Sequence, residues 1–147
     1  MVGPFGQGEQ NYFQMLVKKK HLENSIFLTG YWPHEQVLKF LPSFDVVVAY
    51  HEKNLPIYNV AVPTKILEYL AAGCKIVATN QKMYSNILTH KKDAYLTNQN
   101  PAAFAYGIKK VLDNHELSEN LASNTYHTAK KFSIPKIVDE IEQIYNE

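Results

Sequence analysis

The chain has 147 residues, of which 46% are hydrophobic and 20% are charged, and its net charge at pH 7 is +1. This composition is that of an ordinary globular domain and excludes a disordered or fibrous chain, while the near-zero charge argues against a nucleic-acid scaffold. Cys74 is the only cysteine, which excludes an internal disulfide and a multi-cysteine metal site, and the lack of a long apolar run argues against a transmembrane helix.

Short apolar runs alternate with helical patterns along the chain. The run 45–50 is the strongest strand signal, because a continuous stretch of β-branched residues is typical of a buried parallel strand. Pro63 before and Gly73 after the segment 64–72 give the polarity expected of a helix. In chain order we expect a strand ending at residue 3, a helix at 9–20, a strand at 25–28, a helix at 34–41, strands and helices in turn at 45–50, 64–72, 75–79, 82–88 and 94–97, and helices at 101–113, 117–131 and 135–145.

This alternation predicts an α/β fold: a Rossmann-like parallel sheet flanked by helices on both faces, in a single domain over residues 1–147. Ligands of such sheets bind beyond the carboxyl ends of the strands, and the loops 29–34, 51–62 and 80–84 are expected there. His51 opens the longest of these loops. No acidic or cysteine partner stands at ligand spacing from it, so the pattern does not indicate a metal site.

The most informative segment is the predicted helix at 64–72. Lys65 falls in its first turn, where the positive end of the helix dipole disfavours a cation. An anionic ligand would reverse that sign, because first-turn N–H groups bind anions and the lysine adds a charge. Glu68 follows one turn later, where a carboxylate can accept hydrogen bonds from the diol of a ribose. The pattern therefore fits a nucleotide diphosphate, although on spacing alone a surface Lys65–Glu68 ion pair worth about 0.3 kcal/mol is the simpler interpretation.

The chain also resembles a known family. Residues 63–73 followed by Ile76, Val77 and Ala78 resemble the signature of glycosyltransferase family 4, the group 1 glycosyltransferases of GT-B fold, which reads roughly Pro-x-Lys-x-x-Glu-Tyr-x-Ala-x-Gly-x-Pro-x-Val-Ala. The similarity continues, in order, at residues 2–4, 26–31, 44–48 and 131–133. It thus covers nearly the whole chain.

The resemblance implies the C-terminal, donor-binding half of a two-domain retaining glycosyltransferase. Such an enzyme transfers a sugar from a nucleotide-sugar to a glycan or lipid-linked acceptor, without a bound metal or other cofactor. Carried over by position, Glu68 would bind the ribose hydroxyls. The diphosphate would lie along Val62, Pro63, Thr64 and Lys65, and the base beside Gly30 and Tyr31.

The sequence also departs from the family pattern. Val60 stands where many members have the first carboxylate of a Glu-seven residues-Glu motif, and Lys75 replaces a usual proline. The family's first strand and helix would precede residue 1, so we expect a fragment that does not turn over substrate alone. Its partner would be an acceptor-binding N-terminal domain, and no catalytic residue is assigned in this chain. The full enzyme would be cytoplasmic, free or peripheral to the inner face of the membrane.

Two alternatives stay open. A non-enzymatic, flavodoxin- or receiver-like interaction module explains the alternation of elements but not the Pro-x-Lys-x-x-Glu helix start. The second alternative is half of a nucleotide-sugar epimerase, which only analysis of the reaction product would distinguish from a glycosyltransferase. Two smaller expectations complete the analysis: Cys74 is a small buried hydrophobe, and the broad apolar face of the last helix, beginning at Ile134, is a docking face that the family resemblance suggests packs partly against the N-terminal half.

Overall fold

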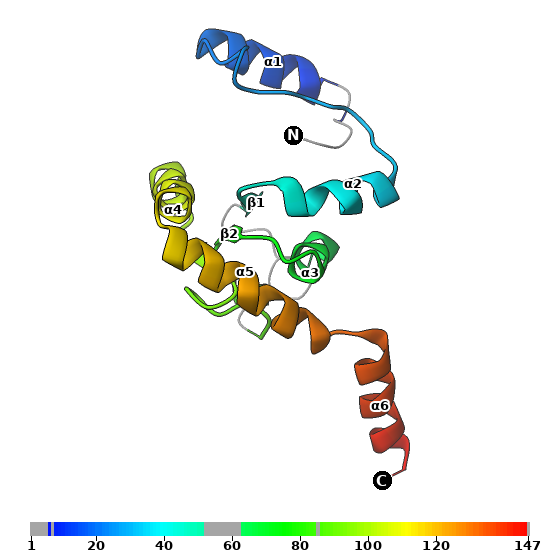
Figure 1. Cartoon of the computed structure of the whole chain (residues 1–147). Helices are drawn as coiled ribbons and strands as arrows, with labels where there is room; N and C mark the ends of the chain where they lie inside the picture. Colours follow the sequence, from blue (N-terminus) through cyan, green and yellow to red (C-terminus); the bar gives the residue numbers. More distant parts are fainter. Residues whose placement is uncertain (1–5, 7, 52–62, 85, 147) are drawn as a thin grey trace. The chain divides into compact units, whose positions relative to one another are not determined.

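A computed structural model of the chain describes residues 6, 8–51, 63–84 and 86–146. The chain forms two compact units, Met1–Phe40 and Leu41–Glu147. The expected strand ending at residue 3 and most of the 51–62 loop lie outside the described residues. Each unit is taken by itself below, and Figure 1 labels their helices and strands.

The first unit contains α1 (Glu9–Lys19) and α2 (His34–Phe40), close to the helices expected at 9–20 and 34–41. Glu9 in the first turn and Lys18 and Lys19 in the last turn suit the dipole of α1. The strand expected at 25–28 is wrong, because these residues form no strand. A strand needs ladder hydrogen bonds to a neighbour, and the described part of this unit offers none.

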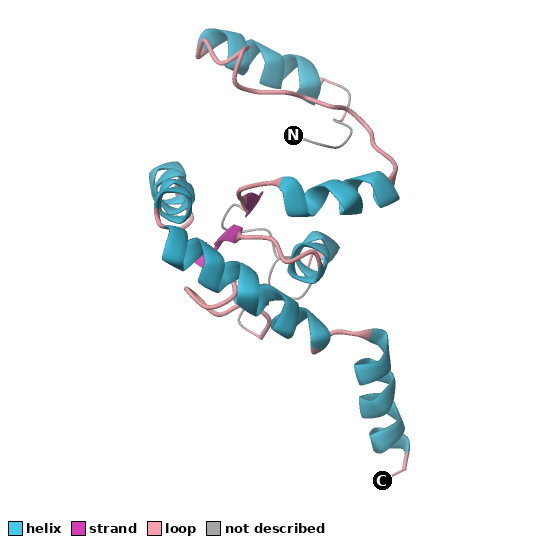
Figure 2. Ribbon diagram, viewed as in Figure 1, coloured by secondary structure: helices cyan, strands magenta, loops and turns pink. Residues whose placement is uncertain are grey.

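The second unit is built on a parallel sheet of β1 (Val47–Ala49), β2 (Ile76–Thr79) and β3 (Tyr95–Thr97), in the order β1-β2-β3. Val48 is in register with Val77, and Ala78 with Leu96. Figure 2 shows these short strands at the centre of the unit, with helices around them. The expected α/β fold with a parallel sheet is therefore confirmed.

The helices of this unit are α3 (Thr64–Ala71), α4 (Pro101–Asp113), α5 (His115–Lys130) and α6 (Ile134–Tyr145), with 3-10 turns η1 (Leu41–Ser43) and η3 (Lys82–Tyr84). α4 packs on β2 and β3, and α5 packs on α3 and α4. Side-chain caps set two helix starts. Asn100 accepts the N–H of Ala103 at 2.8 Å, and Asn114 accepts the N–H of Leu117 at 2.9 Å, which is why α5 begins two residues earlier than expected.

The core of the second unit is centred on β2. Every residue of β2 is fully buried. Because alternate side chains of a strand point to opposite faces, both faces of the sheet are covered at β2, as expected. On one face Val77 packs with Val111 of α4 and Leu121 of α5, and burying each such side chain contributes about 1.5–3 kcal/mol.

β1 is less buried than its sequence suggests. It is shorter than the expected strand 45–50, and Val48 in its middle is 45% exposed. β1 pairs only with β2 among the described strands, so it lies at an edge where the helices around β2 cover one face and leave the other open. A run of valines shows β propensity, but it does not report which strand is central.

α6 has no buried residue. The large apolar side chains of this helix are exposed: Ile134, Ile137, Val138, Ile141, Ile144 and Tyr145. The pattern expected from the sequence is present, and its role as a docking face stays a prediction.

Gly107 of α4 gives a test of the helix–sheet packing. A Cβ there would lie 2.5 Å from Cγ2 of buried Thr97 and 3.2 Å from Cδ1 of Tyr95. We expect Gly107→Ala to lower the free energy of unfolding by about 1–3 kcal/mol, although alanine is the better helix former by about 1 kcal/mol. Urea unfolding measures this. The exposed Ala105→Gly is the control for propensity alone, and a stabilised Gly107→Ala variant would contradict the packing.

Candidate functional site

The N-terminus of α3 lies at the carboxyl edge of the sheet. β1 and β2 are parallel neighbours and α3 connects them, so the helix must begin where β1 ends. Pro63 stands at the N-cap with φ −63° and ψ 127°, which suits its ring-fixed φ. Ile66 and Leu70 are fully buried and anchor the helix.

A glycine ends α3 as expected. Gly73 has a φ of 70°, and its N–H donates to the Leu70 carbonyl at 3.2 Å while the Cys74 N–H donates to the Tyr69 carbonyl at 3.0 Å. These bonds form a Schellman motif, which requires the left-handed conformation that glycine adopts without strain. Both ends of α3 are thus fixed by residues that the sequence pattern singled out.

The residues expected at the diphosphate and ribose fall within five positions of one helix start. Thr64 is exposed, while Pro63, Lys65 and Glu68 are partly buried. Val62 lies outside the described residues, as does Val60. Their binding roles stay predictions.

Gly30 and Tyr31, expected beside the base, belong to the first unit. Gly30 has a φ of 68° and Tyr31 is 74% exposed. They lie in an irregular segment between α1 and α2, and their role at a base stays a prediction.

Lys65 is not a freely solvated lysine. Burial lowers the pKa of its ammonium group below the usual 10.5, because removing part of the water around a charge disfavours the charged form. The positive end of the α3 dipole adds to this cost. An anion bound at the same place would offset both effects. A ligand-binding role therefore accounts for the environment of Lys65 better than a simple surface ion pair with Glu68.

His51 follows β1 and is locked to the end of β2 and the loop beyond it. Its N–H donates to Oγ1 of Thr79 at 3.0 Å, and that hydroxyl donates back to the His51 carbonyl at 3.3 Å. The same carbonyl accepts a bond from Nε2 of Gln81 at 2.9 Å. The structure therefore brings together the starts of two loops, 51–62 and 80–84, that the sequence placed at the ligand-binding edge.

The ring of His51 is also held. Its Nδ1 lies 3.1 Å from the hydroxyl of Tyr84, and the two rings pack edge to face with centroids 6.0 Å apart. Tyr84 is fully buried, and His51 is only 7% exposed. Burial, followed by the charge of Lys65, lowers the pKa of His51 below 6.5.

Sequence reasoning placed His51 at this edge but missed the residues that hold it. Thr79, Gln81 and Tyr84 looked like a strand end and a polar loop, with no motif of their own. The available signal was their position, because they occupy the carboxyl end of β2 and the loop that follows it. A partner of His51 must come from that neighbouring strand end.

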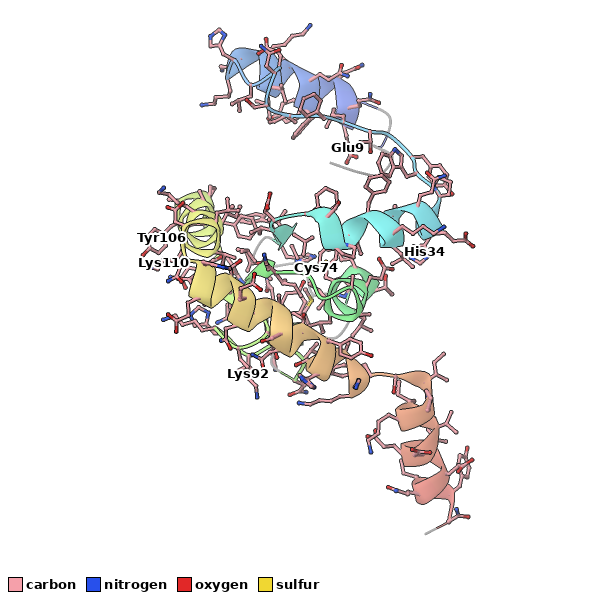
Figure 3. The ribbon with its side chains drawn as sticks, viewed as in Figure 1. Glu9, His34, Cys74, Lys92, Tyr106 and Lys110 are labelled. Atoms are coloured by element: carbon pink, nitrogen blue, oxygen red, sulfur yellow. The ribbon has the colours of Figure 1, made fainter. Side chains whose placement is uncertain are left out.

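Cys74 is a small buried core residue, as expected. It is 2% exposed, its Sγ donates to the Leu41 carbonyl at 3.4 Å, and burial raises the pKa of its thiol to about 11. Figure 3 shows it inside the unit beside α3, whereas Tyr106 and Lys110 project outward from α4. The thiol stays protonated at neutral pH and is a poor nucleophile.

Two searches of the described part of the chain bear on other kinds of site. Histidine, cysteine and acidic side chains form no cluster there that could hold a metal ion. None of the helices described combines the length and the apolar character needed to cross a membrane.

Residues 1–128 match the family model described as "Glycosyl transferases group 1". Among solved structures, Anabaena HepE in complex with UDP and glucose has a TM-score of 0.81 at 21% identity, over 99% of this chain and 39% of that protein. Sucrose-phosphate synthase from Thermosynechococcus elongatus has a TM-score of 0.80 at 19% identity, over 99% of this chain and 37% of that protein. The C-terminal domain of a Francisella tularensis group 1 glycosyl transferase, LpcC, has a TM-score of 0.68 at 20% identity, over 86% of this chain and 63% of that chain.

These structural matches show the fold. The chain spans about two fifths of the length of the Anabaena and Thermosynechococcus proteins. No match was found among curated proteins.

The lowered pKa of His51 predicts how stability depends on pH. The pKa of His90 is lowered too, by burial and by the charge of Lys91. The Nδ1 of His90 accepts a hydrogen bond from the Leu96 N–H at 3.0 Å. Since the folded pKa values lie below the unfolded value of 6.5, the unfolded chain binds more protons below about pH 6.5. Stability from these groups is full above that pH and is lost as the pH falls.

Urea unfolding between pH 8 and pH 5 measures this loss. We expect His51→Asn to flatten the decline, because it removes one of the two described histidines whose pKa is lowered. The exposed His127→Asn in α5 is the matched control and should leave the decline as in the wild type. An unchanged decline in His51→Asn would show that the buried imidazole does not contribute.

Proposed function

Because the chain belongs to the group 1 glycosyl transferases, we propose that it forms the donor side of a glycosyltransferase and binds a nucleotide-sugar at the N-terminus of α3. The observation that carries this proposal is the helix start itself. Pro63, Lys65 and Glu68 occupy one exposed-to-half-buried helix tip at the carboxyl edge of a parallel sheet, which is where ligands of such sheets bind.

The diphosphate is the part of the donor that this tip suits best. First-turn N–H groups and the helix dipole favour a negative charge. Lys65 is a lysine, as are all fifteen residues of the lysine and arginine types in the sequence, which contains no arginine. A lysine acts as a point charge and not as a bidentate fork, so backbone N–H groups would set the orientation of the phosphates.

Glu68 would hold the ribose. It lies one turn beyond Lys65 on α3, and its side chain is partly buried. An ionised carboxylate is an acceptor only, and the neighbouring hydroxyls of a ribose are both donors. The sugar ring next to the diphosphate would therefore be fixed at the distance of one helical turn.

We favour UDP as the nucleotide because the Anabaena protein, whose fold this chain shares, was crystallised with UDP, with UDP and glucose, and with UDP-glucose. In the whole enzyme, a second domain would bring an acceptor to the sugar. Catalysis would come from positioning and from stabilising the departing diphosphate electrostatically, without a metal ion. An interaction module would leave the family match and the α3 helix start unexplained.

Binding of UDP, GDP and ADP tests the proposal in a thermal-shift assay. A nucleotide at about 100 times its dissociation constant should stabilise the chain by roughly 2.7 kcal/mol, and we expect the shift with UDP. Lys65→Met should weaken UDP binding about tenfold or more and leave uridine binding unchanged, because it removes a charge-assisted contact. Glu68→Gln should weaken both ligands.

Matched controls are the exposed Lys110→Met in α4 and Glu116→Gln in α5, which are not part of α3. These variants should bind UDP as the wild type does. If none of the three diphosphates stabilises the wild-type chain, or if the controls weaken binding as much as Lys65→Met, the proposed site is wrong.

A further inference from the structure

His51 is a buried, fixed imidazole at the same edge of the sheet as the proposed diphosphate position. The chain arrives at it from β1, on the sheet edge where α3 begins. Its main chain is bonded on both sides, to Thr79 and to Gln81, so the Cα position is set by the end of β2. The Tyr84 hydroxyl at 3.1 Å from Nδ1 then sets the rotation of the ring.

We propose that His51 is a second diphosphate-binding residue, whose Nε2–H donates to a phosphate oxygen while Tyr84 holds Nδ1. This inference rests on the proposed function, because it names a further residue for the same ligand. In it, Tyr84 is a positioning residue that acts through the imidazole.

A phenol is the partner that suits such a donor. When His51 is neutral with its ring proton on Nε2, the Tyr84 hydroxyl donates to Nδ1. When His51 is protonated, Nδ1–H donates to the phenol oxygen and Nε2 keeps its proton. A hydroxyl can serve in both directions, so the bond to Tyr84 is compatible with both of these states, in each of which Nε2 carries a hydrogen.

The electrostatics of the free site also point to an anion. The charge of Lys65 on α3 acts on the imidazole, Tyr84 of η3 is a titratable partner of the ring, and Thr79 and Gln81 are uncharged partners of the His51 main chain. Burial disfavours positive charge on both His51 and Lys65, and the charge of Lys65 further disfavours protonation of His51. A bound diphosphate would reverse this, raise the pKa of His51, and draw a proton onto the ring.

Two replacements of His51 distinguish the roles of its two ring nitrogens. An asparagine amide reaches the position of Nδ1 and can keep the bond to Tyr84, but it has nothing at Nε2. A glutamine amide reaches the position of Nε2. We expect His51→Asn to raise the dissociation constant of UDP about tenfold with uridine binding unchanged, and His51→Gln to stay within about threefold of the wild type for both ligands.

Tyr84→Phe tests the positioning role. It removes only the hydroxyl from a fully buried ring, and we expect it to weaken UDP binding by about threefold to fivefold. In the His51→Asn background it should cost nothing further, because its effect passes through Nε2. Additive losses in the double variant would show that Tyr84 does not act through His51.

Proton uptake gives a readout that a purely structural histidine would not move. Isothermal titration of UDP near pH 6.5, in two buffers of different ionisation enthalpy, counts the protons taken up on binding. The wild type should take up more than His51→Gln, in which the titrating ring is absent while the protonation of UDP itself is unchanged. Equal uptake would overturn the proposal.

The outcomes distinguish this inference from the proposed function. If the wild type fails to bind UDP, the proposed function fails. If the wild type binds UDP and Lys65→Met weakens it, but His51→Asn binds UDP normally or loses uridine equally, the function stands and the role of His51 is wrong. Should His51→Asn not fold, the uptake by His51→Gln and the affinity of Tyr84→Phe decide in the same way.

Discussion

The complete burial of β2 is the constraint on which the rest of the second unit depends. A strand with no exposed residue must pair on both edges and be covered on both faces. β1 and β3 supply the pairing, and α4 and α5 supply one cover through Val77, Val111 and Leu121. Because all three strands run parallel, their carboxyl ends meet at one edge, and the start of α3 has to lie there.

At that edge the buried end of β2 fixes the position of His51. Thr79 is the last residue of β2, and its hydroxyl bonds both the N–H and the carbonyl of His51. The hydroxyl thus replaces the next rung of the ladder after β1 and β2 stop pairing. The chain can turn away from the sheet at His51 without leaving its backbone groups unpaired, and the imidazole is fixed as a consequence.

The charge pattern at this edge follows from the absence of arginine. A binding site for a diphosphate without guanidinium groups has to combine other donors: a lysine, a helix N-terminus and, in our proposal, an imidazole. Partial burial strengthens each of these contacts once an anionic ligand is bound. Without a nearby negative charge, the same burial disfavours positive charge on these groups. The lowered pKa values of Lys65 and His51 express that second condition.

Local signals in the sequence predicted the elements well where one residue decides the outcome. Pro63 and Gly73 bound α3 as expected, because a ring-fixed φ and a left-handed φ are properties of single residues. Burial was harder to predict. Val48 resembles the residues of β2 in type but is 45% exposed, since the central position in a sheet depends on what pairs and packs from elsewhere. The strand expected at 25–28 failed for the same reason.

The sequence by itself determined the parallel α/β framework, the helix start that carries Lys65 and Glu68, and the resemblance to the family that the model match then showed. These follow from periodicity, from single-residue backbone preferences and from a contiguous motif. Only the tertiary structure decided that Thr79, Gln81 and Tyr84 enclose His51, because hydrogen bonds between residues some thirty positions apart leave no pattern in a single sequence. They exist only once the sheet has placed two strand ends side by side.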